Sequence, residues 1–384
     1  MDRLYQNFIA LIRKGIDGEA LVYDLDHAFT AEQLTAFYRL AKSHDLAHLV
    51  GTALLSGNVT LPEALASTFQ KEQMMALYRY TQIQYELDQI CAVFEAEQIP
   101  HMPLKGAVIR QYYPKPEMRT SCDIDLFVPP EYLDAAVEAL ASKLHYRKDK
   151  KYIYDFALFS PTNVHVELHF NLVEDAKRYQ KILSNVWKSA RLDTGCQYRY
   201  LMSNEMYVAY HIIHMEKHFL NGGCGVRPFV DLWIIKNKMT FDADALMKLM
   251  EQCSLRRFAE CVFRLCDVWF GDLPHDGTTV EMQNFIFSAG IYGSLKNKMS
   301  ISQAEKGGKM KYYISRIFLP LGLLKIQYPF LEKYPFLYPV AQVKRWCRIL
   351  FKNKSNVTRE AELNNNITKA EREKLHSLRK DLGI

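Results

Sequence analysis

The sequence predicts an α+β fold, in which a mixed unit of strands and helices lies between two mainly helical regions. Before residue 99 and after Arg199, apolar residues recur at three- and four-residue spacing, which is typical of helices that bury one face. Between these regions, short strand-like runs alternate with helical stretches. We therefore expect a small sheet at the centre of a largely helical chain.

The length also indicates more than one folding unit. The chain has 384 residues, whereas a single hydrophobic core usually stops growing near ~250 residues. We expect four parts, which are a helical region at 1–98, an α/β core at 99–199, a second helical region at 200–350 and a charged tail at 351–384.

The N-terminal region has two clear helical patterns, over Ala31–Ser43 and Glu63–Gln98, separated by Leu61-Pro62. No chemically suggestive pattern accompanies them, so the plain interpretation is a helical packing domain. In the core we expect the following order: a short apolar run at Met102–Leu104, a helix from Lys105-Gly106 to Tyr113, a strand at Asp123–Val128, a helix at Glu131–Leu144, and strands at Tyr152–Phe159 and Val164–Phe170.

Helical patterns return at Asn204 and run past Trp269, with a break at Asn221-Gly222-Gly223. The last thirty or so residues are dominated by Asn, Lys, Glu and Arg. This composition is compatible with a solvated helix or a disordered segment, and no role is assigned to it.

Charge is unevenly distributed along the chain. The formal net charge is +6, but residues 301–360 alone hold twelve Lys or Arg against three Glu. The remainder is slightly acidic, so an anionic partner is expected to bind the C-terminal third.

The composition excludes several other classes. The eight cysteines form no Cys-x-x-Cys pair, which argues against a zinc ribbon or a redox motif. The N-terminus lacks the basic and apolar regions of a signal peptide, and no run approaches the ~18 apolar residues of a membrane span. We therefore expect a cytoplasmic protein.

Two carboxylates in one predicted strand form the first candidate site. In Asp123-Ile-Asp125-Leu126, alternate side chains point to the same face, so both aspartates share one face while Ile124 and Leu126 enter a core. Their mutual repulsion requires a positive counter-charge. Mg²⁺ prefers oxygen ligands and is often held by one or two carboxylates together with substrate phosphates.

The strand at Val164–Phe170 repeats this pattern, because His165, Glu167 and His169 face one way and apolar residues face the other. If this strand lies beside the first, Glu167 becomes a third carboxylate. Such a triad is suited to two metal ions, and Glu167 would help to deprotonate a nucleophile.

Three residues upstream are candidates for phosphate binding. Gly106 lets the backbone approach a phosphate at the start of a helix, and Lys105 adds positive charge. Arg119, four residues before Asp123, is a further candidate.

Together these motifs resemble a family of uncharacterised bacterial nucleotidyltransferases within the DNA polymerase beta-like superfamily. The resemblance rests on Pro103-Leu-Lys-Gly106, Arg119, Asp123-Ile-Asp125 and Val166-Glu-Leu-His169, and extends over roughly residues 30–345. It implies an antiparallel or mixed sheet flanked by helices. It also implies Mg²⁺-dependent transfer, with Mn²⁺ as an alternative ion, of a nucleoside monophosphate from an NTP, by default ATP, with release of pyrophosphate.

The chain departs from the wider superfamily at two places, because Glu167 stands where many members have Asp and Lys105-Gly106 stands where Gly-Gly or Gly-Ser is usual. The hydroxyl that would help to hold the triphosphate is therefore missing.

A cluster of histidines lies further along, in His211-Ile-Ile-His214-Met-Glu-Lys217-His218. His214 and His218 are four residues apart, which is also a zinc-ligand spacing, but no further ligand is evident. The resemblance favours a helix that presents His214, Lys217 and His218, together with His169, to the nucleotide. It also marks Arg227 and Asp231 as partners of this helix or members of a buried salt bridge.

The segment 311–351 mixes aromatic and basic residues, and four prolines prevent one continuous helix. It is interpreted as a helical lid over the catalytic unit, or as a surface for an anionic lipid, a nucleic acid or a polyphosphate-bearing acceptor.

Three functions remain open. The first is a nucleotidyltransferase in which Asp123, Asp125 and Glu167 bind metal and carry the catalysis on an acceptor hydroxyl or phosphate. The second is an inactive nucleotide-binding regulatory protein with the same fold, and the third is an enzyme that modifies nucleic-acid ends, whose RNA affinity would fall steeply with salt.

Overall fold

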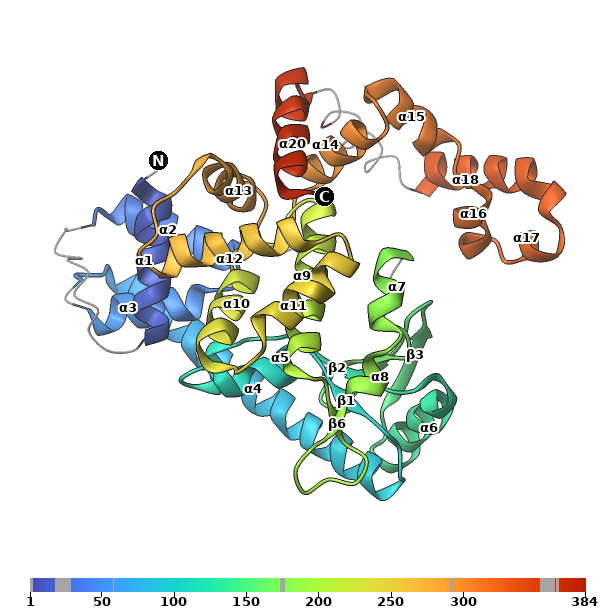
Figure 1. The fold of residues 1–384 in the computed structure, drawn as a ribbon, viewed down its shortest axis with the longest axis horizontal. Helices are drawn as coiled ribbons and strands as arrows, with labels where there is room; N and C mark the ends of the chain where they lie inside the picture. Colours follow the sequence, from blue (N-terminus) through green and yellow to red (C-terminus); the bar gives the residue numbers. More distant parts are fainter. Residues whose placement is uncertain are drawn as a thin grey trace.

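The computed structural model describes residues 3–17, 29–57, 59–172, 177–290, 293–352, 363 and 366–384. Figure 1 shows a small sheet at one end of the molecule, helices over most of the rest, and a helical arm that projects from the body. None of the helices in these ranges is both long and apolar enough to cross a bilayer.

The five-stranded sheet is mixed, as predicted. Its strands, in spatial order, are β1 (Met102–Pro103), β2 (Asp123–Phe127), β5 (His165–His169), β4 (Asp155–Phe159) and β3 (Arg147–Lys151). Only the central pair, β2 and β5, runs parallel, and the other neighbours are antiparallel. The α+β prediction is therefore confirmed.

One face of the sheet is covered by two helices, α4 (Glu63–Ala96) and α6 (Leu133–Lys143). The alternation in the two central strands explains this packing, because every second side chain points to the helices. The resulting core contains Ile124 and Leu126 of β2, Val166 and Leu168 of β5, Ile90 and Phe94 of α4, and Leu133 and Leu140 of α6. The polar residues of β2 and β5 are left on the opposite face.

A larger core joins helices from both ends of the sequence. The N-terminal helices are α1 (Arg3–Asp17), α2 (Ala31–Ser43) and α3 (Ala47–Ser56), and the later ones are α9 (Asn204–Leu220), α10 (Arg227–Lys238), α11 (Ala243–Gln252), α12 (Arg256–Phe270) and α13 (Gly277–Phe287). Buried side chains from these helices form one continuous cluster, and α1 contacts both α3 and α12. The two helical regions thus pack against each other.

Local sequence explains several helix ends. Helix α2 begins at the predicted residue because Thr30 and Gln33 form a capping box. Helix α9 ends before Gly222-Gly223, as predicted. Gly223 has a φ of 133°, and a Cβ there would lie 2.3 Å from the Cβ of Ala289, so only glycine fits the turn.

The core differs from the predicted elements in two places. Strand β3 was not predicted, because its five residues are all charged and exposed at the sheet edge and show no apolar alternation. The predicted helix to Tyr113 consists of a short α-helix, α5 (Gly106–Ile109), and the 3-10 turn η1 (Arg110–Tyr112). Short elements follow the sheet, namely α7 (Lys177–Leu183), α8 (Val186–Ser189), β6 (Arg191–Leu192) and β7 (Tyr200–Leu201).

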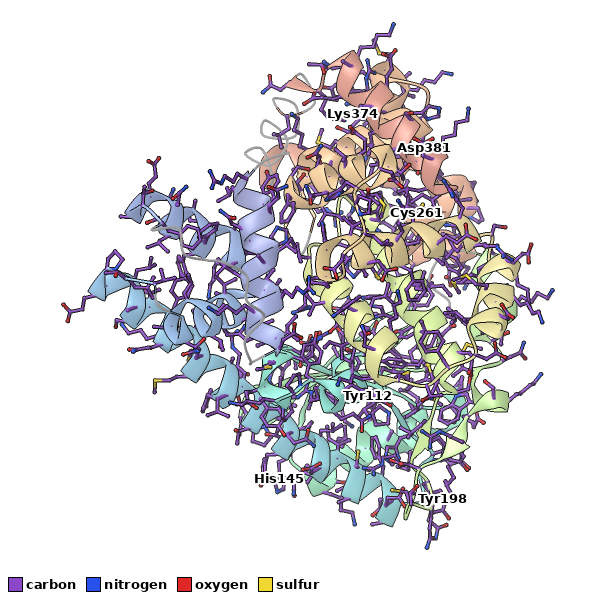
Figure 2. All side chains as sticks on the ribbon, turned by 60° about the vertical axis from the view of Figure 1, so that its left-hand side comes forward. Tyr112, His145, Tyr198, Cys261, Lys374 and Asp381 are labelled. Atoms are coloured by element: carbon purple, nitrogen blue, oxygen red, sulfur yellow. The ribbon has the colours of Figure 1, made fainter. Side chains whose placement is uncertain are left out.

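The end of the chain packs onto the body. Helix α20 (Lys369–Leu382) contacts α12, α13 and α14 (Leu295–Glu305), and its Leu375, Leu378 and Leu382 are buried in the large core. Figure 2 shows Lys374 and Asp381 of this helix on the same side of the molecule as Cys261 of α12. Part of the predicted charged tail is therefore a packed helix, whereas residues 353–362 and 364–365 lie outside the described residues.

The basic aromatic segment forms an arm of four helices, α15 (Lys309–Ile317), α16 (Leu321–Gln327), α17 (Phe330–Lys333) and α18 (Tyr338–Lys352). Helix α15 connects the other three helices to α14, and Figure 1 shows that the arm extends away from the sheet. The interpretation of this segment as a lid over the catalytic unit was therefore wrong.

Candidate active site

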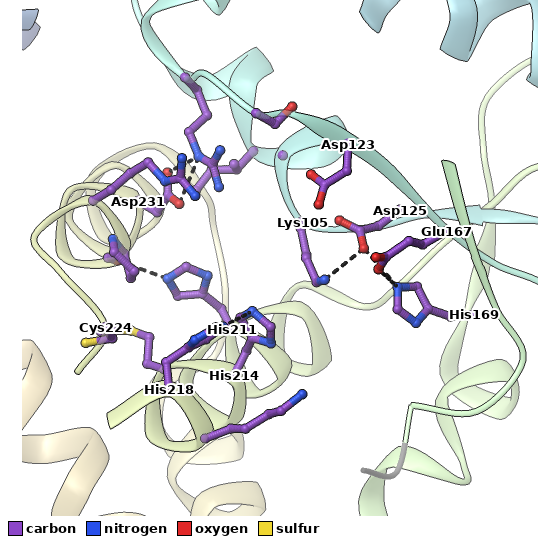
Figure 3. A pocket seen from close by; sticks show the side chains of 18 of the residues that line it. Lys105, Asp123, Asp125, Glu167, His169, His211, His214, His218, Cys224 and Asp231 are labelled. Atoms are coloured by element: carbon purple, nitrogen blue, oxygen red, sulfur yellow. Dashed lines mark hydrogen bonds and ion pairs between the residues drawn. The ribbon is translucent and has the colours of Figure 1, made fainter. Parts of the chain in front are cut away.

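The polar face of the sheet gathers acidic and histidine side chains from three strands. In the parallel pair, Asp125 lies opposite Glu167, and in the antiparallel pair, Asp155 lies opposite His169. Because alternate residues of a strand share a face, Asp123 joins this group. Figure 3 shows the two aspartates, Glu167 and His169 side by side.

These residues form one wall of a cleft of about 380 Å³. Helix α9 forms the facing wall, on which Figure 3 shows His214 and His218. Tyr207 and Lys217 of the same helix also line the cleft. The cleft is lined by every residue predicted to bind metal or phosphate: Lys105, Gly106, Arg119, Asp123, Asp125, Glu167, His169, His214, Lys217 and His218. The fold therefore places all of the predicted site residues around one space.

Asp125 lies at the centre of the charge network. Its Oδ1 accepts hydrogen bonds from Lys105 Nζ and His169 Nε2, each at 2.8 Å, and its side chain is only 4% exposed. Burial by itself would raise the pKa of Asp125, but the attraction of Lys105 and His169 outweighs burial and holds this pKa well below its usual range. Asp125 is therefore ionised at neutral pH.

The other carboxylates differ from Asp125 in their surroundings. Burial, followed by the nearby charge of Asp125, raises the pKa of Asp123. The hydrogen bond from His169 lowers the pKa of Glu167, whose side chain is 27% exposed. Burial works against the charged form of His169, but its hydrogen bonds to Asp125 and Glu167 raise its pKa to about 9. His169 is therefore protonated at neutral pH, and its positive charge interacts with both carboxylates.

The donor set fits a divalent cation. Asp125 and Glu167 each offer a carboxylate oxygen, and His169 offers a ring nitrogen once it has lost its proton; these atoms lie within 4.8 Å of one another. Asp123 adds a further carboxylate, whose pKa is raised first by burial and then by the negative charge of Asp125. Carboxylate oxygens are the ligands that hard divalent ions prefer, and such an ion would relieve the repulsion that Lys105 and His169 now offset.

Lys105 has an unusual backbone conformation, with φ 45° and ψ −120°. A positive φ favours glycine, which agrees with the Gly-Gly or Gly-Ser motif implied for this position by the resemblance. The backbone is held by Tyr207, whose hydroxyl donates to the Lys105 carbonyl at 2.8 Å. The side chain gains the ion pair with Asp125, so a strained backbone places an ammonium group at the metal-ligand cluster.

Arg119 lines the cleft, but a buried salt bridge already uses one edge of its guanidinium. Its Nε lies 2.7 Å from Asp231 Oδ1 and 2.9 Å from Oδ2, and Tyr113 donates a hydrogen bond to the same carboxylate. A phosphate contact by Arg119 stays a prediction. The buried salt bridge of Asp231 is therefore made with Arg119, and Arg227 pairs with Asp45, so among the described residues neither forms the ion pair with α9 or with the other that the resemblance suggested.

The two histidines of α9 pair with each other. Their Nε2 atoms are 2.9 Å apart, and burial lowers the pKa of His214 well below its usual value and that of His218 to about 4. Both rings are therefore neutral at pH 7, and one donates to the other. Glu216, which lies between the two histidines in the helix, bonds to Arg178 and Tyr179. Neither histidine belongs to the cluster of metal-competent groups among the described residues. Among the described residues, no third ligand joins His214 and His218, so the structure does not support a zinc site at this pair.

Lys217 completes the cationic part of the α9 wall. Its pKa is lowered, first by burial and then by repulsion from Lys105. Glu167 and Asp155 act in the opposite direction and favour its charged form. The charge of Lys217 therefore interacts with charged residues of the sheet side of the cleft, namely Lys105, Glu167 and Asp155.

Two residues of the site escaped the sequence analysis. Asp155 begins β4 and lines the cleft, and burial followed by the charge of Glu167 raises its pKa. It shares its strand face with Ala157 and Phe159, so no polar alternation singles it out. Tyr207 lies among the apolar residues of α9, where its spacing indicates only a buried helical face.

Comparison with known proteins gave one family and one solved structure. The model of a family described as uncharacterised nucleotidyltransferase matches residues 30–271, which is more than half of the chain. The solution structure of the antibiotic-resistance factor ANT(2'')-Ia is similar at 15% sequence identity and a TM-score of 0.34, over 48% of this chain and 97% of that protein. No functionally curated protein matched the sequence.

Proposed function

Because the chain belongs to the family of uncharacterised nucleotidyltransferases, we propose that it transfers a nucleoside monophosphate from an NTP to an acceptor hydroxyl or phosphate. The observation that carries this proposal is the register of β2 and β5, which brings Asp125 beside Glu167 in the cleft. In the reaction, the acceptor oxygen bonds to the α-phosphorus as the bond to pyrophosphate breaks. ATP is the default donor.

The carboxylates are assigned the metal-binding role. Asp123, Asp125 and Glu167 would hold Mg²⁺ or Mn²⁺, which supplies positive charge to the triphosphate and to the charge that develops in the transition state. Glu167 is also assigned the role of base that accepts the proton of the acceptor hydroxyl. Its lowered pKa keeps it ionised, and its partial exposure leaves it accessible to an acceptor.

The cations around the carboxylates are assigned to the phosphates. Lys105 and Lys217 approach the cleft from opposite walls, as Figure 3 shows for Lys105. Gly106, Arg119 and His169 line the sheet side, while the neutral pair His214 and His218 offers a hydrogen bond from the α9 side. Charge-assisted hydrogen bonds to phosphate oxygens are stronger than neutral ones, so the lysines should dominate binding.

Pyrophosphate release is the direct test of transfer. The protein would be incubated with Mg²⁺, each labelled NTP in turn and a lysate that supplies acceptors, and both pyrophosphate and labelled products would be measured. Label on a product with stoichiometric pyrophosphate supports the proposal, provided that Glu167→Gln reduces both. Binding of NTP without release, in every lysate tested, would instead support the inactive regulatory protein, for which the Lys105–Asp125 ion pair is the structural argument.

The contribution of Lys105 is tested by a binding measurement. Lys105→Met should weaken binding of Mg²⁺-NTP by on the order of tenfold or more, because a charge-assisted hydrogen bond contributes about 1.5–3 kcal/mol. Titration calorimetry would report the change. Lys143→Met is the matched control, since Lys143 lies on α6 with its side chain 58% exposed. An unchanged nucleotide affinity would mean that Lys105 serves only to neutralise Asp125.

A further inference from the structure

The helical arm, residues 309–352, has a core of its own that is small and separate. Leu324, Tyr328, Leu331 and Ala341 form a buried cluster among α16, α17 and α18. Outside this cluster the arm exposes many large apolar side chains. Of the twenty-one such exposed side chains among the described residues, ten belong to the arm: Met310, Ile314, Ile317, Phe318, Leu323, Phe330, Tyr334, Phe336, Val340 and Val343. An apolar surface concentrated in this way marks a site of interaction.

The arm is also strongly basic. It holds nine Lys or Arg residues and a single acidic residue, Glu332. Among the described residues, neither Lys309 nor Lys311 has an ion-pair partner. The surface therefore combines apolar side chains with two lysines for which the described part of the chain provides no ion-pair partner.

Helix α15 arranges these two properties on one face. At about 100° per residue, Met310, Ile314 and Ile317 fall in a single stripe along the helix. They are 72%, 52% and 48% exposed, respectively. The same geometry places Lys309 and Lys311 on the two flanks of the stripe. Helix α15 is thus an amphipathic helix whose apolar face is turned to solvent.

The opposite face of α15 is fixed to the protein, so the stripe cannot turn inward. Tyr312 is buried in a cluster with Met299 of α14. At the C-terminal end, Arg345 of α18 donates hydrogen bonds to the carbonyls of Arg316 and Ile317, and Trp346 donates to Ile317 as well. These contacts cap the helix and hold its apolar stripe outward.

We propose that α15 is a membrane-surface helix that docks the protein on an anionic lipid bilayer. In the docked state, Met310, Ile314 and Ile317 enter the boundary between headgroups and acyl chains, while Lys309 and Lys311 contact lipid phosphates. An exposed apolar stripe with cations on both flanks matches this interface. A single-stranded nucleic acid fits less well, because the stripe consists of aliphatic side chains and offers no aromatic face for base stacking.

Vesicle flotation of the full-length protein tests the proposal independently of any enzymatic activity. The protein should float with vesicles of phosphatidylcholine and phosphatidylglycerol and remain at the bottom with phosphatidylcholine alone. Binding should fall as salt is added, since surface charges are screened. Ile314→Asp should lower the partition coefficient about tenfold or more, and Lys309→Gln or Lys311→Gln should lower it about fivefold each.

Two control variants outside the arm test whether the loss of any exposed apolar side chain or any exposed lysine would lower vesicle binding. Leu273→Asp changes an apolar side chain that is 46% exposed outside the arm, and Lys248→Gln removes an exposed lysine of α11, so both should float like the unmodified protein. Thermal melts would verify that Ile314→Asp is folded. Failure to float with the anionic vesicles, or flotation of Ile314→Asp at the level of the unmodified protein, overturns the proposal. Salt-sensitive binding to single-stranded RNA without flotation would reassign the surface to nucleic acid.

Discussion

Replacing Asp125 by Asn should lower the rate of nucleotide transfer by on the order of 10³-fold, because the carboxylate is expected to hold the catalytic metal, whose charge stabilisation amounts to several kcal/mol. Asp125 is the residue of choice because it is buried, ionised and bonded to both Lys105 and His169. The neutral amide keeps the shape of the side chain and removes its charge. The rate of pyrophosphate release at saturating NTP is the measurement.

The control for this variant is Asp149→Asn. Asp149 lies in the edge strand β3 with its side chain 42% exposed, and it does not line the cleft. It should retain full activity. Titration with Mn²⁺ gives a readout separate from turnover, since Asp125→Asn should weaken metal binding while Asp149→Asn leaves it unchanged. If Asp125→Asn transferred nucleotide as fast as the unmodified protein, the proposal that Asp125 holds the catalytic metal would be wrong.

Much of this site follows from strand alternation alone. The pattern of β2 predicts that Asp123 and Asp125 share a face, and the pattern of β5 predicts the same for Glu167 and His169. The alternation within each strand does not determine which residue of β2 lies opposite which residue of β5. That Asp125 lies directly opposite Glu167 depends on how two strands about forty residues apart align, which the tertiary packing decides.

The features that escaped prediction share a physical cause, which is that they depend on contacts distant in the sequence. The ion pair between Lys105 and Asp125 is made by a lysine whose backbone φ is positive, a conformation that the residue type does not predict. The partner of Arg119 lies 112 residues away. The outward stripe of α15 was visible as a mixture of basic and aromatic residues, but which face is covered is known only once Tyr312 and Arg345 are placed.

Asp231→Asn should destabilise the folded protein by about 3–5 kcal/mol, because it leaves the charge of Arg119 buried without its partner. The side chains of Arg119 and Asp231 are 9% and 2% exposed, so water cannot replace the lost carboxylate. Urea denaturation gives the free energy of unfolding. Arg119→Met should have a similar effect, and the double variant should lose less than the sum of the two. Additive losses would show that the pair is not coupled.

The same ion pair predicts how stability depends on pH. Burial works against ionisation of Asp231, but the attraction of Arg119 outweighs it and lowers the pKa of Asp231 in the folded state. A lowered folded-state pKa means that the stabilisation is fully present above the unfolded value of about 4 and is lost as the pH falls through the folded value. Asp231→Asn should therefore reduce the acid sensitivity of unfolding, and an unchanged pH profile would count against the assignment. Because the pair joins the loop before β2 to α10, it links the strand that holds the proposed metal ligands to the helical core, and its loss should loosen the position of Asp123 as well as lower stability.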